Sequence, residues 1–157
     1  MRLSSLSRRT GKALKKSGQT LVTAESCTGG WVAQAVTSVA GSSEWFERGY
    51  VTYSNAAKRE ALGVRASTLA RHGAVSERTA REMAHGALQR SRGTICVSIT
   101  GIAGPGGGAP GKPVGTVCFG WAQGRRMRSE TKRFKGGRAS VRRQAAIHAL
   151  RGVLKWL

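Results

Sequence analysis

Apolar residues recur at helical spacing in five parts of the chain, and small or polar residues stand where each pattern stops. The spacing predicts helices over residues 3–17, from 31 to a stop at 41, over 56–62, over 77–90 and over 138–157. Asn55 and Ser76 are the expected N-caps of the third and fourth helices. Gly18 and Gly63 are expected to end the first and the third.

Short β-rich runs separate these helices. They predict strands over residues 20–24, 50–54, 94–100, 114–122 and 125–134. Trp45 and Phe46 fall between two patterns, and we expect them in a short turn or helix. Strands and helices alternate through the first two thirds of the chain, and a hairpin and a helix close it. This order predicts an α/β fold, a single-domain three-layer α/β/α sandwich with a mixed sheet, over residues 1–157 with its core over 10–155.

The charge balance is strongly basic, with 27 Lys and Arg against 7 acidic residues, all of them Glu, and a net charge of +20. The absence of Asp disfavours a Ser-His-Asp triad, an aspartyl dyad and an EF-hand loop. The charge suggests either nucleic acid or a phosphorylated substrate as the partner. Because the basic residues are spread along the chain without the signature of a nucleic-acid module, nucleic acid is not expected as the main partner.

Three widely spaced cysteines, Cys27, Cys96 and Cys118, form no CxxC pair. Their number and spacing disfavour a zinc knuckle or a disulfide framework and favour reduced thiols, and hence a cytoplasmic location. No apolar stretch approaches the roughly 18–20 residues of a membrane span. The basic N-terminus is not followed by the apolar region of a secretory signal, so no membrane partner is expected.

The segment 24–30 (AESCTGG) lies where a buried strand is expected to turn into a helix. The first N–H groups of a helix have no helical partner, so such a corner can bind an anion or stabilise an oxyanion beside a serine nucleophile. Ser26 is the candidate nucleophile. Cys27 competes for the same role, because a helix N-terminus acidifies a thiol, but no histidine stands in a motif with it. The alternative is an ordinary helix start with Ser and Thr as caps.

A second corner, at the end of the strand predicted over 50–54, carries Tyr53 and Lys58. A lysine in a partly dry pocket can lose its proton and act as a base, and a tyrosine can relay that proton or stabilise an oxyanion. A Ser–Lys or Ser–Tyr–Lys set needs neither His nor Asp, so it remains open to this chain. The alternative is a solvated surface lysine beside a half-buried tyrosine.

Two further segments are candidates for ligand binding. The loop 101–113, with six Gly and three Pro, follows an expected central strand, where open α/β sheets bind ligands. It lacks the Gly-Lys-Ser/Thr ending of a phosphate-binding NTPase loop. Arg138 and Arg142 are four residues apart on the closing helix and suit a phosphate, unless they belong to a solvated basic face.

Several strings occur together and in order: 24–30 (AESCTGG), 51–55 (VTYSN), Lys58, 72–76 (HGAVS), 100–105 (TGIAGP) and 112–117 (KPVGTV). In these strings the chain closely resembles the CinA C-terminal domain family, whose stand-alone bacterial members are nicotinamide-nucleotide amidases. The resemblance implies hydrolysis of the carboxamide of nicotinamide mononucleotide to nicotinate mononucleotide and ammonia, in pyridine-nucleotide salvage. It also implies a homo-oligomer and a reaction without a metal or other cofactor. The alternative function is a basic nucleic-acid-associated or nucleotide-binding module without catalysis.

The resemblance also assigns roles to residues. Ser26 is implied as the nucleophile and Lys58 as the base, with Tyr53 between them or at the oxyanion. The other implied residues contact the substrate: Glu25, Thr28, Gly29, Gly30, Asn55, Thr100, Gly101, Gly104, Arg138 and Arg142. The chain departs from its relatives in having Gly136-Gly137 where they often carry Gly-Asp before the last helix, and in having no acidic residue over 105–111.

Overall fold

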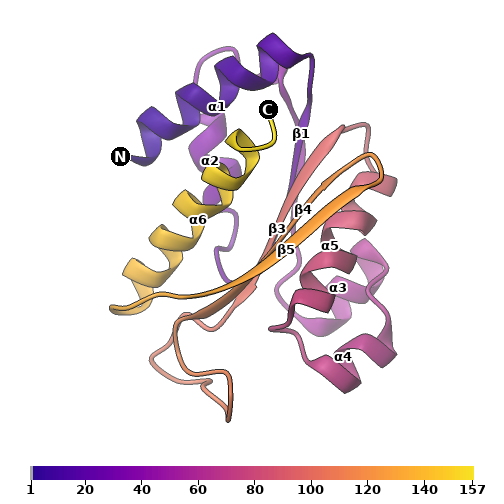
Figure 1. The fold of residues 1–157 in the computed structure, drawn as a ribbon, viewed down its shortest axis with the longest axis vertical. Helices are drawn as coiled ribbons and strands as arrows, with labels where there is room; N and C mark the ends of the chain where they lie inside the picture. Colours follow the sequence, from indigo (N-terminus) through magenta and orange to yellow (C-terminus); the bar gives the residue numbers. More distant parts are fainter. Residues whose placement is uncertain (1) are drawn as a thin grey trace.

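The structure is a computed structural model that describes residues 2–157. A five-stranded sheet runs through its centre in the order β2-β1-β3-β4-β5, and helices cover both of its faces (Figure 1). The strands are β1 (Leu21–Glu25), β2 (Phe46–Val51), β3 (Ile95–Gly101), β4 (Thr116–Gln123) and β5 (Arg126–Arg133). The helices are α1 (Leu3–Ser17), α2 (Trp31–Thr37), α3 (Asn55–Leu62), α4 (Ala66–His72), α5 (Glu77–Gln89) and α6 (Arg138–Leu154), with a 3-10 turn η1 (Ser42–Glu44) before β2.

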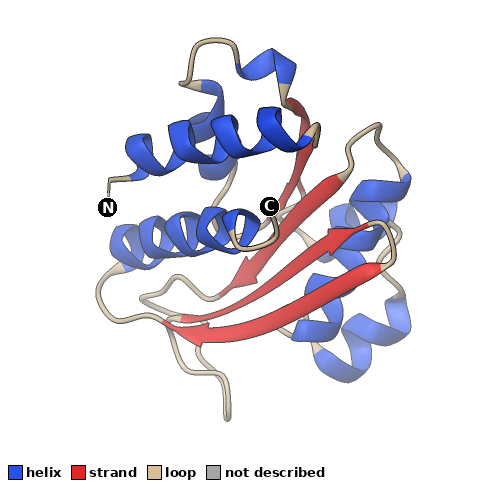
Figure 2. Cartoon of the chain, turned by 45° about the horizontal axis from the view of Figure 1, so that its top comes forward, coloured by secondary structure: helices blue, strands red, loops and turns tan. Residues whose placement is uncertain are grey.

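The pairing of the strands brings the expected site segments to one edge of the sheet. Strand β1 is parallel to both of its neighbours, β2 and β3. Strands β3, β4 and β5 pair antiparallel, so the sheet is mixed. Because parallel strands end at the same edge, the segments that follow β1, β2 and β3 meet there. The loop between β3 and β4 projects from that edge (Figures 1 and 2).

Two layers of helices bury the two faces of the sheet, as the three-layer prediction requires. Helices α1, α2 and α6 cover one face, where Phe119 and Trp121 stack with ring centroids 5.6 Å apart in the larger core cluster. Helices α3, α4 and α5 cover the other, around Met83 and Leu62. The α/β sandwich and its mixed sheet are confirmed. None of the helices in residues 2–157 combines the length and the apolar character needed to cross a membrane.

Several local predictions were wrong. Phe46, expected with Trp45 in a short turn or helix, is the first residue of β2, and α2 ends at Thr37 and not at Gly41. The second strand spans Phe46–Val51 and not 50–54, because this charged, partly exposed edge strand shows little apolar alternation. Ser54, and not Asn55, caps α3, since its hydroxyl accepts a hydrogen bond from the N–H of Ala57 at 3.0 Å. Helix α4 was not predicted, because Thr68 is its one buried residue and leaves no apolar period to recognise.

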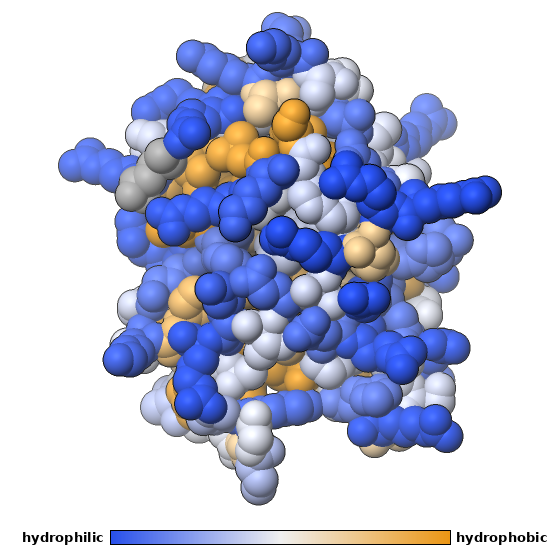
Figure 3. Space-filling model, in the orientation of Figure 1, coloured by the Kyte–Doolittle hydropathy of each residue, from blue (hydrophilic) through white to orange (hydrophobic). Residues whose placement is uncertain are grey.

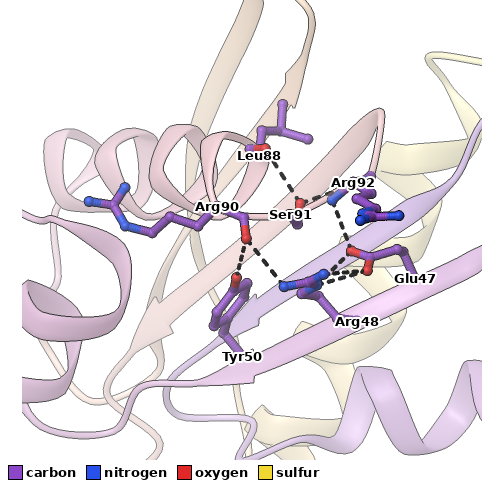
Figure 4. Close-up of polar contacts among 8 residues, drawn as sticks. Glu47, Arg48, Tyr50, Leu88, Arg90, Ser91 and Arg92 are labelled. Carbon is purple, nitrogen blue, oxygen red and sulfur yellow. Dashed lines mark hydrogen bonds and ion pairs between the residues drawn. The ribbon is translucent and has the colours of Figure 1, made fainter.

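Side-chain contacts attach the edge strand β2 to the chain that follows α5 (Figure 4). The Tyr50 hydroxyl and the Arg48 guanidinium both donate to the Arg90 carbonyl, at 3.1 and 3.3 Å. The Glu47 carboxylate accepts from the N–H of Arg92 at 3.2 Å. Figure 3 shows a mostly hydrophilic surface, with hydrophobic residues gathered between α1 and the C-terminal part of α6.

Candidate active site

Ser26 is the first residue after β1, and the main chain fixes it on both sides. Its N–H donates to the Ile99 carbonyl of β3 at 2.9 Å, and its carbonyl accepts from the N–H of Gly29, also at 2.9 Å. Residues 26–29 therefore form a tight turn, which we call the nucleophile turn. The Ser26 side chain is buried but reaches the cavity described below. The strand-to-helix corner expected from the sequence is present.

Lys58 comes from the first turn of α3 and meets Ser26 below the surface. Its amine Nζ lies 3.0 Å from Ser26 Oγ and donates to the carbonyl oxygens of Thr52 and Tyr53, at 3.0 and 3.1 Å. As an ammonium, the group donates to all three oxygens. As a neutral amine, it keeps two N–H bonds on the carbonyls and turns its lone pair to the Ser26 hydroxyl. The geometry thus suits proton transfer from Ser26 to Lys58.

The surroundings of Lys58 favour its neutral form. Only 1% of the residue is exposed, and within residues 2–157 no carboxylate forms an ion pair with it. Burial lowers the pKa of the Lys58 ammonium below its ordinary value of 10.5. A solvated surface lysine is therefore not what the structure has. Ser26 and Lys58 thus have the geometry of a pair that can activate a serine without histidine.

A cavity of about 270 Å³ opens over this pair. Of the residues expected at the site, Ser26, Tyr53, Asn55, Lys58, Thr100, Gly101, Gly104 and Arg138 line it. The other lining residues are Cys27, Ala74, Val75, Ile102, Ala103, Gly106 and Gly107. Ala74 and Val75 were not singled out as site residues, although they lie within the HGAVS string. The hydroxyl of Thr100 donates to the Ala74 carbonyl at 2.8 Å, which ties that wall to β3.

Tyr53 meets the pair through its main chain and not through its ring. Its carbonyl accepts from Lys58, while its hydroxyl accepts from Nη2 of Arg138 at 3.0 Å. Arg138 also donates through Nη1 to the Gly104 carbonyl at 2.7 Å. The Tyr53 hydroxyl therefore does not lie between Ser26 and Lys58, one of the two places that the resemblance implied for it; the other, at the oxyanion, stays a prediction. The hydroxyl belongs to a bridge across the cavity mouth that joins Tyr53, Arg138 and the loop after β3.

Five residues that were expected to contact the substrate do not line the cavity: Glu25, Thr28, Gly29, Gly30 and Arg142. The buried Glu25 carboxylate accepts from the Thr28 hydroxyl at 2.7 Å and from two N–H groups of α2, those of Val32 and Ala33, at 3.0 Å. Glu25 thus supplies the N-terminal capping of α2 from within β1. The capping glycine Gly30 has a φ of 100°, a conformation that favours glycine.

Cys27 is the rival nucleophile, and its surroundings oppose that role. The thiol is buried, and burial raises its pKa to about 12. A helix N-terminus lowers the pKa of an exposed thiol, but here desolvation dominates. At neutral pH the side chain is a protonated thiol, so it lines the cavity as a small apolar group.

Comparison with known proteins gives one consistent family. The model of the CinA C-terminal domain matches residues 3–157. The nicotinamide-nucleotide amidohydrolase PncC of Escherichia coli (strain K12) is 58% identical over 150 residues, which cover 94% of this chain and 90% of that protein. The PncC of Pseudomonas putida is 48% identical over 98% of this chain and 96% of its own length.

Solved structures agree with the sequence relatives. The competence/damage inducible protein CihA from Agrobacterium tumefaciens superposes with a TM-score of 0.95 at 44% identity, over 98% of this chain and 94% of that one. A CinA superfamily protein from Klebsiella pneumoniae 700603 superposes with a TM-score of 0.96 at 40% identity, over 99% and 97% of the two chains.

Proposed function

The chain belongs to the CinA C-terminal domain family, and from this premise we propose that it is a nicotinamide-nucleotide amidase. It hydrolyses the carboxamide of nicotinamide mononucleotide to nicotinate mononucleotide and ammonia. The observation that carries the proposal is the 3.0 Å contact between Lys58 Nζ and Ser26 Oγ at the floor of a cavity. The amidohydrolases among its relatives supply the substrate class.

The first half of the reaction forms an ester on Ser26. Ser26 Oγ attacks the carboxamide carbon while its proton passes to the neutral amine of Lys58. The C–N bond then breaks, and the proton on Lys58 goes to the departing amide nitrogen, which leaves as ammonia. The products of this half are ammonia and a nicotinoyl ester of Ser26.

The second half hydrolyses that ester. A water molecule gives a proton to Lys58, and its oxygen attacks the ester carbon. The C–O bond to Ser26 breaks, Lys58 returns the proton to Ser26 Oγ, and the acid leaves as nicotinate mononucleotide. One water is consumed and one amide bond is broken, so Ser26 and Lys58 end as they began.

The phosphate end of the substrate is assigned to Arg138. This arginine lines the cavity, and its two bonds to Tyr53 and Gly104 hold the guanidinium in one orientation. The N–H groups that those bonds leave over suit a phosphate oxygen. An Arg138→Ala variant is expected to raise KM for the mononucleotide about tenfold or more while kcat changes little.

The direct test is release of ammonia from nicotinamide mononucleotide. Wild type is expected to turn over, and Ser26→Ala and Lys58→Ala are each expected to lose at least about 1,000-fold in kcat. Ser43→Ala and Lys16→Ala, at exposed positions, are matched controls that should keep full activity. Substantial turnover by Ser26→Ala would overturn the nucleophile. Tight binding of the nucleotide by folded wild type without ammonia release would favour a binding module instead.

We also propose the setting of this activity. The enzyme works in pyridine-nucleotide salvage in the cytoplasm. The three unpaired, buried cysteines support the cytoplasmic location, because disulfides are rare there. It is a homo-oligomer, as the resemblance to the family implies. Light scattering after size-exclusion chromatography tests the assembly, and a monomer at working concentration would overturn it.

A further inference from the structure

Two arginines on successive turns of α6 do different things. Arg138 lines the cavity, whereas Arg142, one turn further along, is absent from its lining. Arg142 instead donates through Nε to the Cys27 carbonyl at 3.1 Å and through Nη2 to the Thr28 carbonyl at 3.3 Å. Its guanidinium also lies over the Trp31 ring, 5.3 Å from the centroid. Helices α2 and α6 lie on the same face of the sheet, which makes this contact possible (Figure 1).

We infer that Arg142 is a positioning residue for the nucleophile: it holds the nucleophile turn by two carbonyl oxygens and so fixes where Ser26 Oγ meets Lys58 and the substrate. It neither binds the phosphate nor takes part in proton transfer. The inference rests on the proposed function, because it concerns the same serine.

The peptide units of the turn carry the effect to Ser26. In a trans peptide the N–H points away from the C=O, so the carbonyl that Arg142 holds sets the direction of the next N–H. The Thr28 carbonyl is bound to Arg142, and the N–H of the following residue, Gly29, donates to the Ser26 carbonyl at 2.9 Å. One rigid peptide therefore links the guanidinium to the main chain of Ser26.

Charged groups hold the segment from both ends. Glu25 accepts from the first N–H groups of α2, while Arg142 donates to the carbonyls of the turn before that helix. The fork of a guanidinium reaches two acceptors at once, which a single ammonium does not reproduce with the same geometry. Loss of Arg142 removes its hydrogen bonds to the Cys27 and Thr28 carbonyls, and at these two carbonyls the bond from the N–H of Trp31 to the Thr28 oxygen, at 3.0 Å, is what remains. We expect the turn to be held less tightly in that state. Displacement of a reacting atom by about 1 Å can cost about 100-fold in rate.

The experiment compares Arg142→Ala and Arg142→Lys with Arg143→Ala, the neighbouring arginine, which is exposed. Arg142→Ala is expected to lower kcat by about 10- to 100-fold with KM for nicotinamide mononucleotide within about threefold of wild type. Arg142→Lys is expected to recover little. Added methylguanidinium, at concentrations well below denaturing, should restore part of kcat to Arg142→Ala and leave wild type and Arg143→Ala unchanged.

Other results would overturn the inference. Unchanged kcat would do so, and so would a rise in KM without a fall in kcat, which would make Arg142 a phosphate ligand. A third result would also do so: Arg142→Ala loses kcat, melts at a lower temperature than wild type and is not rescued by methylguanidinium. Arg142 would then only stabilise the packing of α2 against α6.

A second measurement is independent of turnover. Amide hydrogen exchange at Gly29 should be faster in Arg142→Ala than in wild type or Arg143→Ala, while exchange in β3 stays unchanged. Equal exchange at Gly29 in all three proteins would contradict the inference. If wild type releases no ammonia, the proposed function fails, and exchange at Gly29 still decides whether Arg142 holds the turn.

Discussion

Lys58 Nζ and Ser26 Oγ lie 3.0 Å apart although 32 positions separate the residues in the chain. The contact follows from the sheet. Strands β1 and β2 are parallel neighbours, so the turn after β1 and the start of α3 after β2 meet at one edge. Ser26 is held there by β3, and Lys58 by two carbonyls that follow β2. The proposed catalytic pair is thus placed by main-chain pairing more than by contacts between side chains.

The buried lysine should make stability depend on pH. The pKa of Lys58 is lowered in the folded protein and has its ordinary value, 10.5, in the unfolded chain. Between these two values the unfolded chain binds more protons, so stability rises with pH. Stability falls as the pH decreases toward the pKa that Lys58 has in the folded protein. Below that pKa, Lys58 is a buried ammonium in the folded protein, and its full desolvation cost lowers the free energy of unfolding.

Lys58→Met removes that dependence. The free energy of unfolding by urea, measured from about pH 7 upward, should favour the variant most at low pH, and its advantage over wild type should shrink as the pH approaches 10.5. Lys16→Met, at an exposed position, should run parallel to wild type. An advantage of Lys58→Met that is constant with pH would show that the lysine is not desolvated.

The fold could be predicted where apolar periods are strong. Helices α1 and α5, the central strand β3 and the hairpin of β4 and β5 were predicted within about three residues at each end, because their inner faces are continuous. The strand that was misplaced, β2, and the helix that was missed, α4, lie at the periphery. There the sheet or the core covers few side chains. Tertiary contacts determine the secondary structure, and the sequence has no apolar pattern from which to predict it.

The site was predictable in its composition but less so in its geometry. The strand-to-helix corners identified Ser26 and Lys58 as candidates. The spacing of Arg138 and Arg142 predicted that both lie on one face of a helix. One helical turn advances about 5.4 Å along the axis. That distance is enough for Arg138 to line the cavity while Arg142 binds the carbonyls of Cys27 and Thr28. The partners of Arg142 are more than 110 positions away, at Cys27 and Thr28, so no local pattern reports them.

Cys27 should be dispensable for chemistry. With a pKa of about 12, only about one thiol in 10,000 is ionised at pH 8. Cys27→Ala is therefore expected to keep kcat within about threefold of wild type, and iodoacetamide at that pH should not inactivate the enzyme within the time that labels an exposed thiol. Rapid inactivation that substrate prevents, together with an inactive Cys27→Ala, would return the nucleophile role to the thiol.

Glu25 should matter for folding more than for substrate affinity. Glu25→Gln replaces one carboxylate oxygen by an NH₂ group, which then faces an N–H donor of α2. We expect a loss of about 1–3 kcal/mol in the free energy of unfolding, measured with urea. Glu60→Gln, on the exposed side of α3, is the matched control and should stay within about 0.5 kcal/mol of wild type. Equal stability of the two variants would contradict the capping role.

Tyr53 distinguishes two accounts of the site. Its hydroxyl is bound to Arg138, and only its carbonyl touches Lys58, so Tyr53→Phe keeps the contact that supports the catalytic pair. The variant is expected to raise KM several-fold, because Arg138 loses one of the two groups that orient it, and to keep kcat within about threefold of wild type. A hydroxyl that relays the proton or stabilises the oxyanion would instead cost about 100-fold or more in kcat. Steady-state ammonia release by Tyr53→Phe, measured beside Arg138→Ala, decides between them. A rise in KM in both variants, smaller in Tyr53→Phe and with kcat kept, supports the bridge at the cavity mouth. A collapse of kcat in Tyr53→Phe alone places the hydroxyl in the chemistry.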